Sequence, residues 1–299
     1  MKRIRLLRRL ALGLGLLGVL SEVGARAQVA PGSRAQVSAV VTAEAAEGFR
    51  VPQVRLPNAA VARRINRQLL RYVTANFRSI DSTAAPARQL YQAARECCYD
   101  QETKGWRAGG DGLTAVSYTV LLNQDYLLSL EFSDDEGGLT QPETHHLTFD
   151  LRTGRRLTLT DLLADPPAEL NRRLGWAVNR RLREELANVA AAYGDSTTID
   201  YVAQLYGFYG RDEWNTTPRH DFTSPAVPDS LYDYDQLVKY ELAEFALRPQ
   251  ALLLFHPVGM SRLNLEFLPS ETYTFPFERL HPRGLLVLLA TKAKLAKRR

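Results

Sequence analysis

Apolar residues recur every fourth position in two long stretches of the chain and every second position in many short ones. A period of four places apolar side chains along one side of a helix, whereas a period of two places them on one face of a strand. We therefore expect two long amphipathic helices, over residues 58–77 with Asn58 as N-cap and over residues 170–193, and a shorter helix over residues 85–98. The two stripes are Val61, Ile65, Leu69, Val73 and Phe77, and Leu170, Leu174, Val178, Leu182, Leu186, Val189 and Tyr193.

The alternation of apolar and polar residues that is typical of strands is clearest between residues 116 and 132. Two alternating runs, 116–122 and 126–132, flank the polar residues Asn123, Gln124 and Asp125, which predicts an antiparallel hairpin with one apolar face under a helix. The residues expected to be buried there are Val116, Tyr118, Leu128 and Leu130, and further strands are expected at 37–43, 51–56, 147–151, 157–159, 243–247, 251–255, 263–267 and 273–277.

Strands joined by short turns favour antiparallel sheets, and long amphipathic helices need a sheet to pack on. The expected fold class is therefore α+β, with antiparallel sheets each packed by a long helix. We expect two successive subdomains, residues 28–152 and 153–286, the second with an irregular aromatic insertion at 194–240. A basic, solvated tail is expected at 287–299.

Residues 1–27 predict a signal peptide. A basic run precedes the apolar stretch 10–20, and Ala25-Arg26-Ala27 offers the small residues that favour cleavage before Gln28. Six of the 38 Lys and Arg residues and one of the 33 Asp and Glu residues lie in this segment, so the remainder has 32 of each. The net charge of +5 therefore does not indicate a nucleic-acid partner. We expect an extracytoplasmic protein, periplasmic or secreted, without stable membrane insertion after cleavage.

A characteristic string follows the hairpin. After Leu128-Ser129-Leu130-Glu131-Phe132 and the pair Gly137-Gly138 comes Phe149-Asp150-Leu151-Arg152-Thr153-Gly154-Arg155-Arg156-Leu157-Thr158-Leu159-Thr160-Asp161-Leu162-Leu163. This order resembles a domain of unknown function that forms the extracytoplasmic part of the RsiV anti-sigma factor and the N-terminal region of PdaC-type peptidoglycan deacetylases. In that family a small residue and a His usually follow the paired glycines. This chain has Leu139 and Thr140 there, so no role passes to Thr140.

The resemblance implies an exported, non-catalytic binding or sensing module of the cell envelope, with peptidoglycan or a lysozyme-like protein as partner. The same string also has a structural interpretation, because Gly154 suits a tight turn and Thr160 or Asp161 can cap the next helix. A cell-wall glycan hydrolase or deacetylase-like enzyme is the alternative, since a glycosidase needs only two well-spaced carboxylates. A structural envelope protein is the second alternative. We predict no catalytic residue, metal or cofactor.

Several polar residues have two interpretations. Asp134, Asp135 and Glu136 suit either a calcium site or an acidic loop, and we favour the loop because no EF-hand spacing is present. His145 and His146 are neighbours on a predicted strand and point to opposite faces, so they cannot share a metal. By alternation with the apolar residues that follow, we expect His145 in the core and His146 exposed.

Cys97 and Cys98 are the only cysteines. Because they are adjacent they cannot link distant parts of the chain, so we expect two thiols or one local disulfide rather than a redox or metal site.

Eight aromatic residues lie between Tyr201 and Tyr234. Exposed Tyr and Trp stack on sugar rings and anchor protein interfaces, which makes Tyr206, Tyr209 and Trp214 our candidate ligand-binding residues. The alternative is that the segment folds back and buries its rings.

Overall fold

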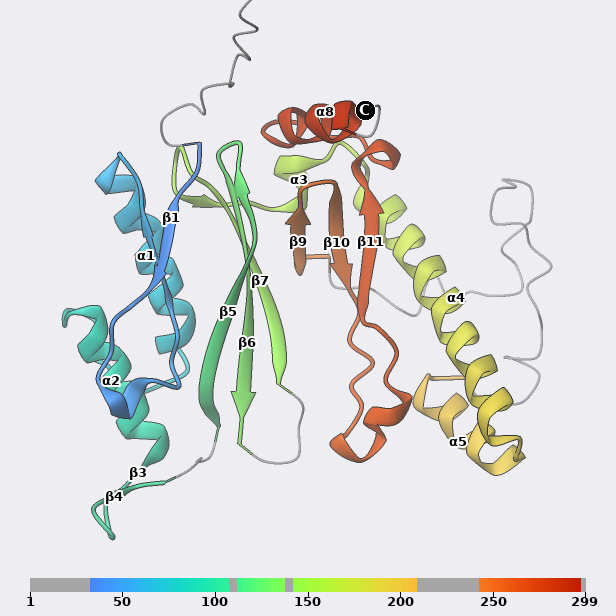
Figure 1. Ribbon diagram of the computed structural model, residues 1–299, viewed down its shortest axis with the longest axis horizontal. Coiled ribbons are helices and arrows are strands. Elements are labelled where there is room, and N and C mark those ends of the chain that lie inside the picture. The colour runs from blue at the N-terminus through green and yellow to red at the C-terminus, as the bar shows by residue number, and fades with distance from the viewer. Residues whose placement is uncertain (1–32, 108–111, 138–141, 209–241, 297–299) are drawn as a thin grey trace, which may run out of the picture. The chain divides into compact units, whose positions relative to one another are not determined.

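The computed structural model describes residues 33–107, 112–137, 142–208 and 242–296 (Figure 1). Its fold class is α+β, as predicted, because antiparallel sheets are combined with long helices. The larger sheet has the strand order β5-β6-β7-β8 and the second has the order β11-β10-β9. The strands of these sheets are β5 Leu113–Gln124, β6 Leu127–Glu136, β7 Glu143–Asp150, β8 Arg155–Arg156, β9 Phe245–Arg248, β10 Ala251–Phe255 and β11 Thr272–Pro276.

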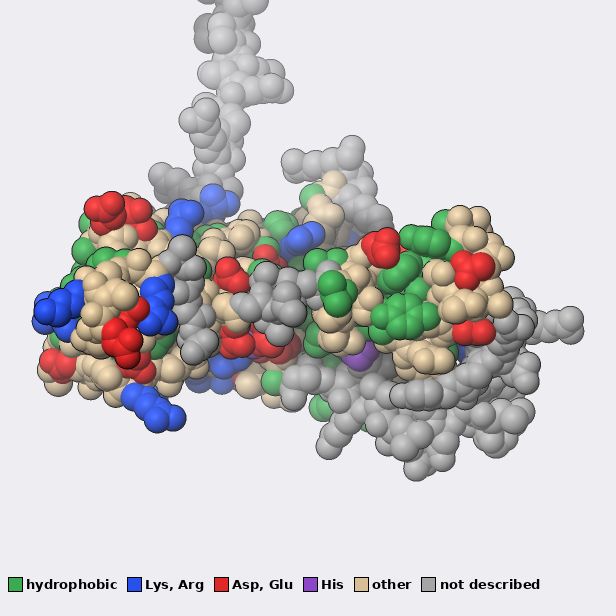
Figure 2. Space-filling view, turned by 90° about the horizontal axis from the view of Figure 1, so that it is seen from below, with side chains coloured by type: hydrophobic (Ala, Val, Ile, Leu, Met, Phe, Trp, Pro, Cys, Tyr) green, Lys and Arg blue, Asp and Glu red, His purple; other side chains and the backbone are tan. Residues whose placement is uncertain are grey.

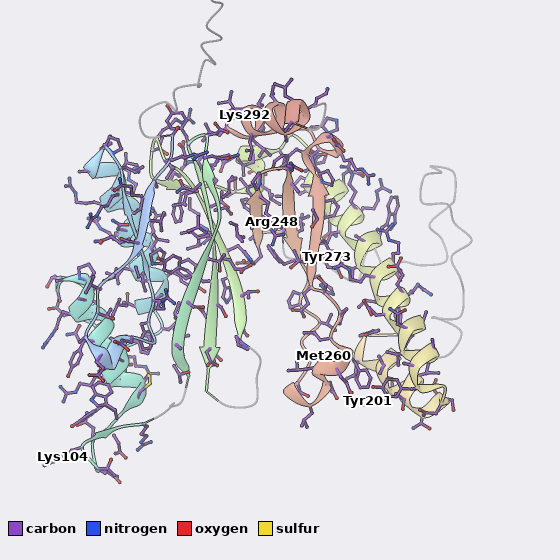
Figure 3. The ribbon with its side chains drawn as sticks, viewed as in Figure 1. Lys104, Tyr201, Arg248, Met260, Tyr273 and Lys292 are labelled. Atoms are coloured by element: carbon purple, nitrogen blue, oxygen red, sulfur yellow. A yellow bond between two sulfur atoms is a disulfide. The ribbon has the colours of Figure 1, made fainter. Side chains whose placement is uncertain are left out.

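The predicted hairpin is β5–β6, but its turn has two residues and begins two residues later than the expected turn at 123–125. Asp125 and Tyr126 form the turn with φ of 54° and 64°. Positive φ at both central residues is the geometry that suits the twist of a two-residue hairpin. The turn is held from both ends of the described chain, because Tyr126 N donates to Ser33 O at 3.0 Å and Lys292 Nζ contacts Asp125 Oδ1. Lys292 lies on α8 (Figure 3).

One face of the larger sheet packs on two helices. In α1, Ala59–Thr74, Asn58 caps the first turn as predicted by accepting from Ala60 N and Val61 N. In α2, Pro86–Cys98, Pro86 occupies the first helical position, where its missing N–H costs nothing. The apolar stripe of α1 and the inward residues of β6 share one hydrophobic cluster, in which the fully buried residues include Ile65, Leu69, Val73, Leu128, Leu130 and Phe132.

The opposite face of the larger sheet is covered by the second sheet. Leu247 N of β9 donates to the buried Ser129 Oγ of β6 at 3.0 Å, and the His146 ring of β7 stacks on the Phe255 ring of β10 at 3.7 Å. Helix α4, Pro167–Tyr193, packs on this second sheet, and the buried residues that they share in a second hydrophobic cluster include Leu170, Leu174, Leu186, Leu252, Leu254 and Tyr273. The order of layers is therefore helices, larger sheet, smaller sheet, helix (Figure 1).

The remaining elements are short. They are β1 Gln36–Ala39, η1 Glu44–Ala46, β2 Pro52–Arg55, β3 Tyr99–Asp100, β4 Gly105–Trp106, α3 Leu159–Leu162, α5 Ser196–Leu205, η2 Arg262–Phe267, η3 Phe277–Arg279 and α8 Leu286–Ala296. Cys97 and Cys98 form a disulfide at the end of α2. None of the helices in the described ranges is both long and apolar enough to cross a membrane.

Some elements differ from the sequence-based expectation. The predicted strand at 263–267 is the 3-10 helix η2, in which Leu263 is 82% exposed, and Figure 2 shows hydrophobic side chains gathered over this part. Helix α5 lies within the stretch expected to be irregular, and α8 occupies the expected tail. The N-cap residue of α3 is Thr158, and Asp161 takes part in capping from the third helical position, where its side chain accepts from Thr158 N at 2.8 Å.

The alternation in β5 is interrupted. A shift in register between Val120 and Leu122 turns the end of the strand over, so Leu122 joins the cluster around α4 while Val116 stays under α1. Val120 is 38% exposed. The division into two subdomains at residue 152 stays a prediction.

Leu130→Ala should lower the free energy of unfolding by about 2 to 5 kcal/mol, because it empties a fully buried site under α1. Val120→Ala, on the neighbouring strand and partly exposed, is the control and should cost about 0.5 kcal/mol or less. Denaturant unfolding of both variants measures the difference, and equal values would contradict the packing of β6 under α1.

Candidate functional site

A cleft of about 570 Å³ lies between α1 and the β6–β8 side of the larger sheet. Its lining combines acidic, basic and neutral polar groups over an apolar floor formed by Leu147 and Phe149. The polar lining residues that matter below are Gln68, Arg71 and Tyr72 from α1, Asp134 from β6, Glu143 and His145 from β7, and Arg156 from β8.

The β7–β8 turn holds α1 beside the sheet. Gln68 Nε2 donates to Gly154 O at 2.8 Å, and Arg64 Nη1 donates to Thr153 O at 3.0 Å. Gly154 has φ of 72°, and a Cβ there would lie 3.0 Å from Val61 O. Only glycine therefore allows the turn to approach α1 this closely. The Thr-Gly part of the string is thus explained by helix packing.

Asp134 is the most constrained group of the cleft. Its side chain projects toward α1, the residue is 6% exposed, and its Oδ2 accepts a hydrogen bond from the Tyr72 hydroxyl at 2.6 Å. Within the described residues no group donates to Oδ1. Burial raises the pKa of the Asp134 carboxyl, and burial together with the bond to Asp134 raises the pKa of the Tyr72 phenol. A buried acceptor without a donor is costly, so this oxygen is suited to a donor supplied by a ligand.

Glu143 and His145 lie beside Asp134. The register of β6 and β7 pairs Asp134 with Glu143 and Phe132 with His145, so all four side chains share one face. His145 Nε2 is 3.5 Å from Glu143 Oε2, and its Nδ1 is 3.8 Å from Glu244 Oε1. Hydrogen bonding to Glu244 and the nearby carboxylates raise the pKa of His145, which is 36% exposed. The cleft therefore carries acidic groups beside an imidazole whose pKa is raised.

His146 faces the other way, into the contact between the two sheets. Its Nδ1 is 3.4 Å from Glu244 Oε2 and its Nε2 is 3.3 Å from Glu131 Oε2, and the residue is buried. The sequence predicted a buried His145 and an exposed His146, and both predictions are wrong because His145 is partly exposed and His146 is buried. The alternation was correctly assigned, but the second sheet covers the face that was expected to be polar and solvated.

Glu244 links both histidines. It precedes β9 and accepts from His146 N at 2.9 Å, and its oxygens lie 3.4 Å from His146 Nδ1 and 3.8 Å from His145 Nδ1. Burial alone would raise the pKa of Glu244, but the hydrogen bonds from His145 and His146 lower it to about 2.

Of the residues predicted to bind a ligand, Tyr206 alone lies in the described part of the chain. Tyr206 is 7% exposed and its hydroxyl donates to Phe267 O at 2.6 Å, which is the packed arrangement for this ring. Tyr209 and Trp214 lie outside the described residues. A ligand-binding role for the segment therefore stays a prediction.

Sequence reasoning missed the cleft, although one signal was present. Asp134 continues the inward series Leu128, Leu130 and Phe132, so it is an acidic residue at a core position of a strand. The expected acidic loop at 134–136 is instead the end of β6, where successive side chains point to opposite faces. In the described part of the chain no three His, Cys, Asp or Glu residues gather as a metal site requires.

No protein-family model and no curated protein matches the chain. The solved structures that are similar to it include two described as members of the DUF3298 family. The protein from Bacteroides fragilis NCTC 9343 is 11% identical, with 82% of this chain and 87% of that chain covered and a TM-score of 0.38. The protein from Pseudomonas aeruginosa PAO1 is 13% identical, with 84% and 94% covered and a TM-score of 0.40. Sequence identities and TM-scores this low assign no function to the chain. The finer resemblance to RsiV and PdaC stays a prediction.

Glu244→Gln should lower thermal stability by an amount that depends on pH. The pKa of Glu244 is about 2 in the folded chain against 4.5 ordinarily, so its contribution is present above pH 4.5 and is lost as the pH falls toward 2. The pKa of His145 is raised above 6.5, so its contribution is complete below pH 6.5 and is lost as the pH rises through the folded-state value. The Tm difference between wild type and variant should therefore be largest between pH 4.5 and 6.5.

The control for this measurement is Glu184→Gln, because Glu184 is an exposed partner of Arg180 at 3.9 Å. Its Tm difference should be small at every pH. A Glu244→Gln effect that is equal at about pH 3, 5.5 and 8 would contradict the assigned coupling of Glu244 with the histidines.

Proposed function

We propose that the chain is an exported, non-catalytic binding module of the cell envelope, and that the cleft between α1 and the larger sheet is its ligand site. The observation that carries the proposal is Asp134 Oδ1, a buried carboxylate oxygen that lines the cleft and receives no donor from the described residues. A bound ligand with a hydroxyl, amide N–H or ammonium group supplies that donor.

The other lining groups define the rest of the ligand. Arg71 and Arg156 line the same cleft as Asp134 and Glu143, so the cleft offers fixed positive charge as well as hydrogen-bond acceptors. A ligand with both hydroxyl or amino groups and carboxylates matches this lining. Fragments of peptidoglycan have this chemistry, since they join sugar hydroxyls to a short peptide with free amino and carboxyl groups. Peptidoglycan is also the partner that the family resemblance implies.

One observation favours the enzyme alternative. Burial raises the pKa of Asp134, which stands opposite Glu143 in register, and a carboxyl of raised pKa beside a second carboxylate is an arrangement that glycan hydrolases use. Against it, the Tyr72 hydroxyl occupies Asp134 Oδ2 and the second strand carboxylate is the exposed Glu143. We therefore place binding ahead of hydrolysis.

Asp134→Asn should weaken binding of soluble peptidoglycan fragments about tenfold or more, because the amide presents a donor where the ligand needs an acceptor. Isothermal titration measures the affinity, and mass analysis of the ligand afterwards reports any hydrolysis. The variant should keep its Tm, since asparagine has the same shape as aspartate and its amide oxygen still accepts from the Tyr72 hydroxyl.

Asp135→Asn is the matched control, because it makes the same change one residue along β6 on the opposite face. It should bind like the wild type. Wild-type binding by Asp134→Asn would remove the cleft as the site, and cleavage of the ligand by the wild type would establish the enzyme instead. A parallel titration with lysozyme tests the other partner that the resemblance implies.

Export is proposed from the order of basic, apolar and small residues in 1–27. The intact mass of protein recovered from the extracytoplasmic fraction should correspond to a chain that starts at Gln28. Full-length protein confined to the cytosol would contradict export.

A further inference from the structure

A second surface, formed by α2 and the β3–β4 hairpin, combines aromatic rings with arginines. The Arg88 guanidinium lies 5.8 Å from the centre of the Tyr91 ring, and that of Arg95 lies 5.4 Å from the Tyr99 ring. Both tyrosine rings meet the Trp106 ring edge to face, at 5.9 and 5.2 Å. We call these five residues the Arg–aromatic surface.

The guanidinium charges of this surface are available to a ligand. Arg88 and Arg95 are exposed, and among the described residues no carboxylate lies within ion-pair distance of either. The nearby acids are engaged elsewhere. Glu96 accepts from the backbone of Arg78 and Ser79, and Asp100 pairs with Arg107 at 2.7 Å.

The surface is also held in place. The disulfide between Cys97 and Cys98 lies directly between Arg95 and Tyr99 in the chain. Arg107 N donates to Cys98 O at 2.8 Å, which ties the second strand of the hairpin to the end of α2. Lys104 marks the hairpin turn in Figure 3, and Figure 2 shows Lys and Arg side chains among acidic ones over these elements. A ligand therefore meets rings whose positions are already set.

We propose that the Arg–aromatic surface binds an acidic polysaccharide, in which Trp106 stacks on a sugar ring and Arg88 and Arg95 pair with sugar carboxylates. Trp106 is 44% exposed, and a large exposed ring offers its face to the C–H side of a pyranose. Arg88 and Arg95 are seven residues apart on one helix, which separates their backbones by about 10.5 Å. That separation is comparable with one disaccharide of an extended polysaccharide, so a polymer with one carboxylate in each disaccharide matches both arginines.

This inference is independent of the cleft, since the two sites share no residue. An acidic peptide also offers carboxylates, but it lacks a ring to cover Trp106. A neutral glycan offers the ring and leaves both guanidinium groups without partners. The combination of the two features selects the acidic polysaccharide.

The test is titration of the full chain with hyaluronate oligosaccharides, which alternate a uronic acid with a neutral amino sugar. Affinity should be about tenfold or more higher than for chito-oligosaccharides of equal length or for polyglutamate. Trp106→Ala should weaken binding about tenfold. Arg88→Gln with Arg95→Gln should weaken it similarly and reduce its dependence on salt.

The matched control for charge is Arg63→Gln with Arg67→Gln, which removes two exposed arginines from α1 and should leave affinity unchanged. Arg88→Gln with Arg95→Gln should still bind soluble peptidoglycan fragments as the wild type does, because neither arginine lines the cleft, so failure of the cleft proposal and failure of this one are distinguishable. If Trp106→Ala lowers the Tm, the affinity of the variant Arg88→Gln with Arg95→Gln decides the test, because both arginine side chains are exposed and their loss leaves the fold intact. Absence of hyaluronate binding, equal binding of polyglutamate, or wild-type affinity in the arginine variant would overturn the proposal.

Discussion

The larger sheet must be covered on both faces, and the rest of the fold depends on this constraint. Leu127 and Leu128 are neighbours on β6, yet they belong to different hydrophobic clusters, one around α4 and one under α1. Polar groups on the face toward the second sheet must therefore find partners inside the protein. Ser129 accepts from Leu247 N, and His146 lies between Glu131 and Glu244. These bonds set the place of the second sheet relative to the first.

The sequence predicted the elements whose pattern is local. The stripe of α1, its Asn58 cap and the β5–β6 hairpin were all found, because each depends on residues close together in the chain. The predictions that failed concern residues whose surroundings are formed by segments distant in the chain. His146 looks solvent-facing until the second sheet covers it, and the alternation at 263–267 cannot distinguish a strand from the 3-10 helix η2. The candidate cleft could be predicted only in part for the same reason. The sequence shows Asp134 as an acidic residue in an apolar series, but the packing of α1 and β8 brings Tyr72 and Arg156 to the same cleft.

Two contacts of α1 with the larger sheet border the cleft. Arg64 and Gln68 bind the turn at Gly154, and Tyr72, one helical turn after Gln68, donates to Asp134 Oδ2. The contact of α1 with the turn at Gly154 and its contact with Asp134 therefore both depend on the orientation of this helix. A residue with a side chain at 154 would push α1 outward and change the cleft, although residue 154 does not line it.

The turn at Asp125 and Tyr126 also contacts parts of the chain that are synthesised long before and long after it. The hairpin itself is local and can form as soon as β6 has been synthesised. Its turn, however, is bound by Ser33 from the start of the described chain and by Lys292 from α8. In a nascent chain the turn therefore lacks its contact with Lys292 until α8 has been synthesised, so this contact is among the last to form.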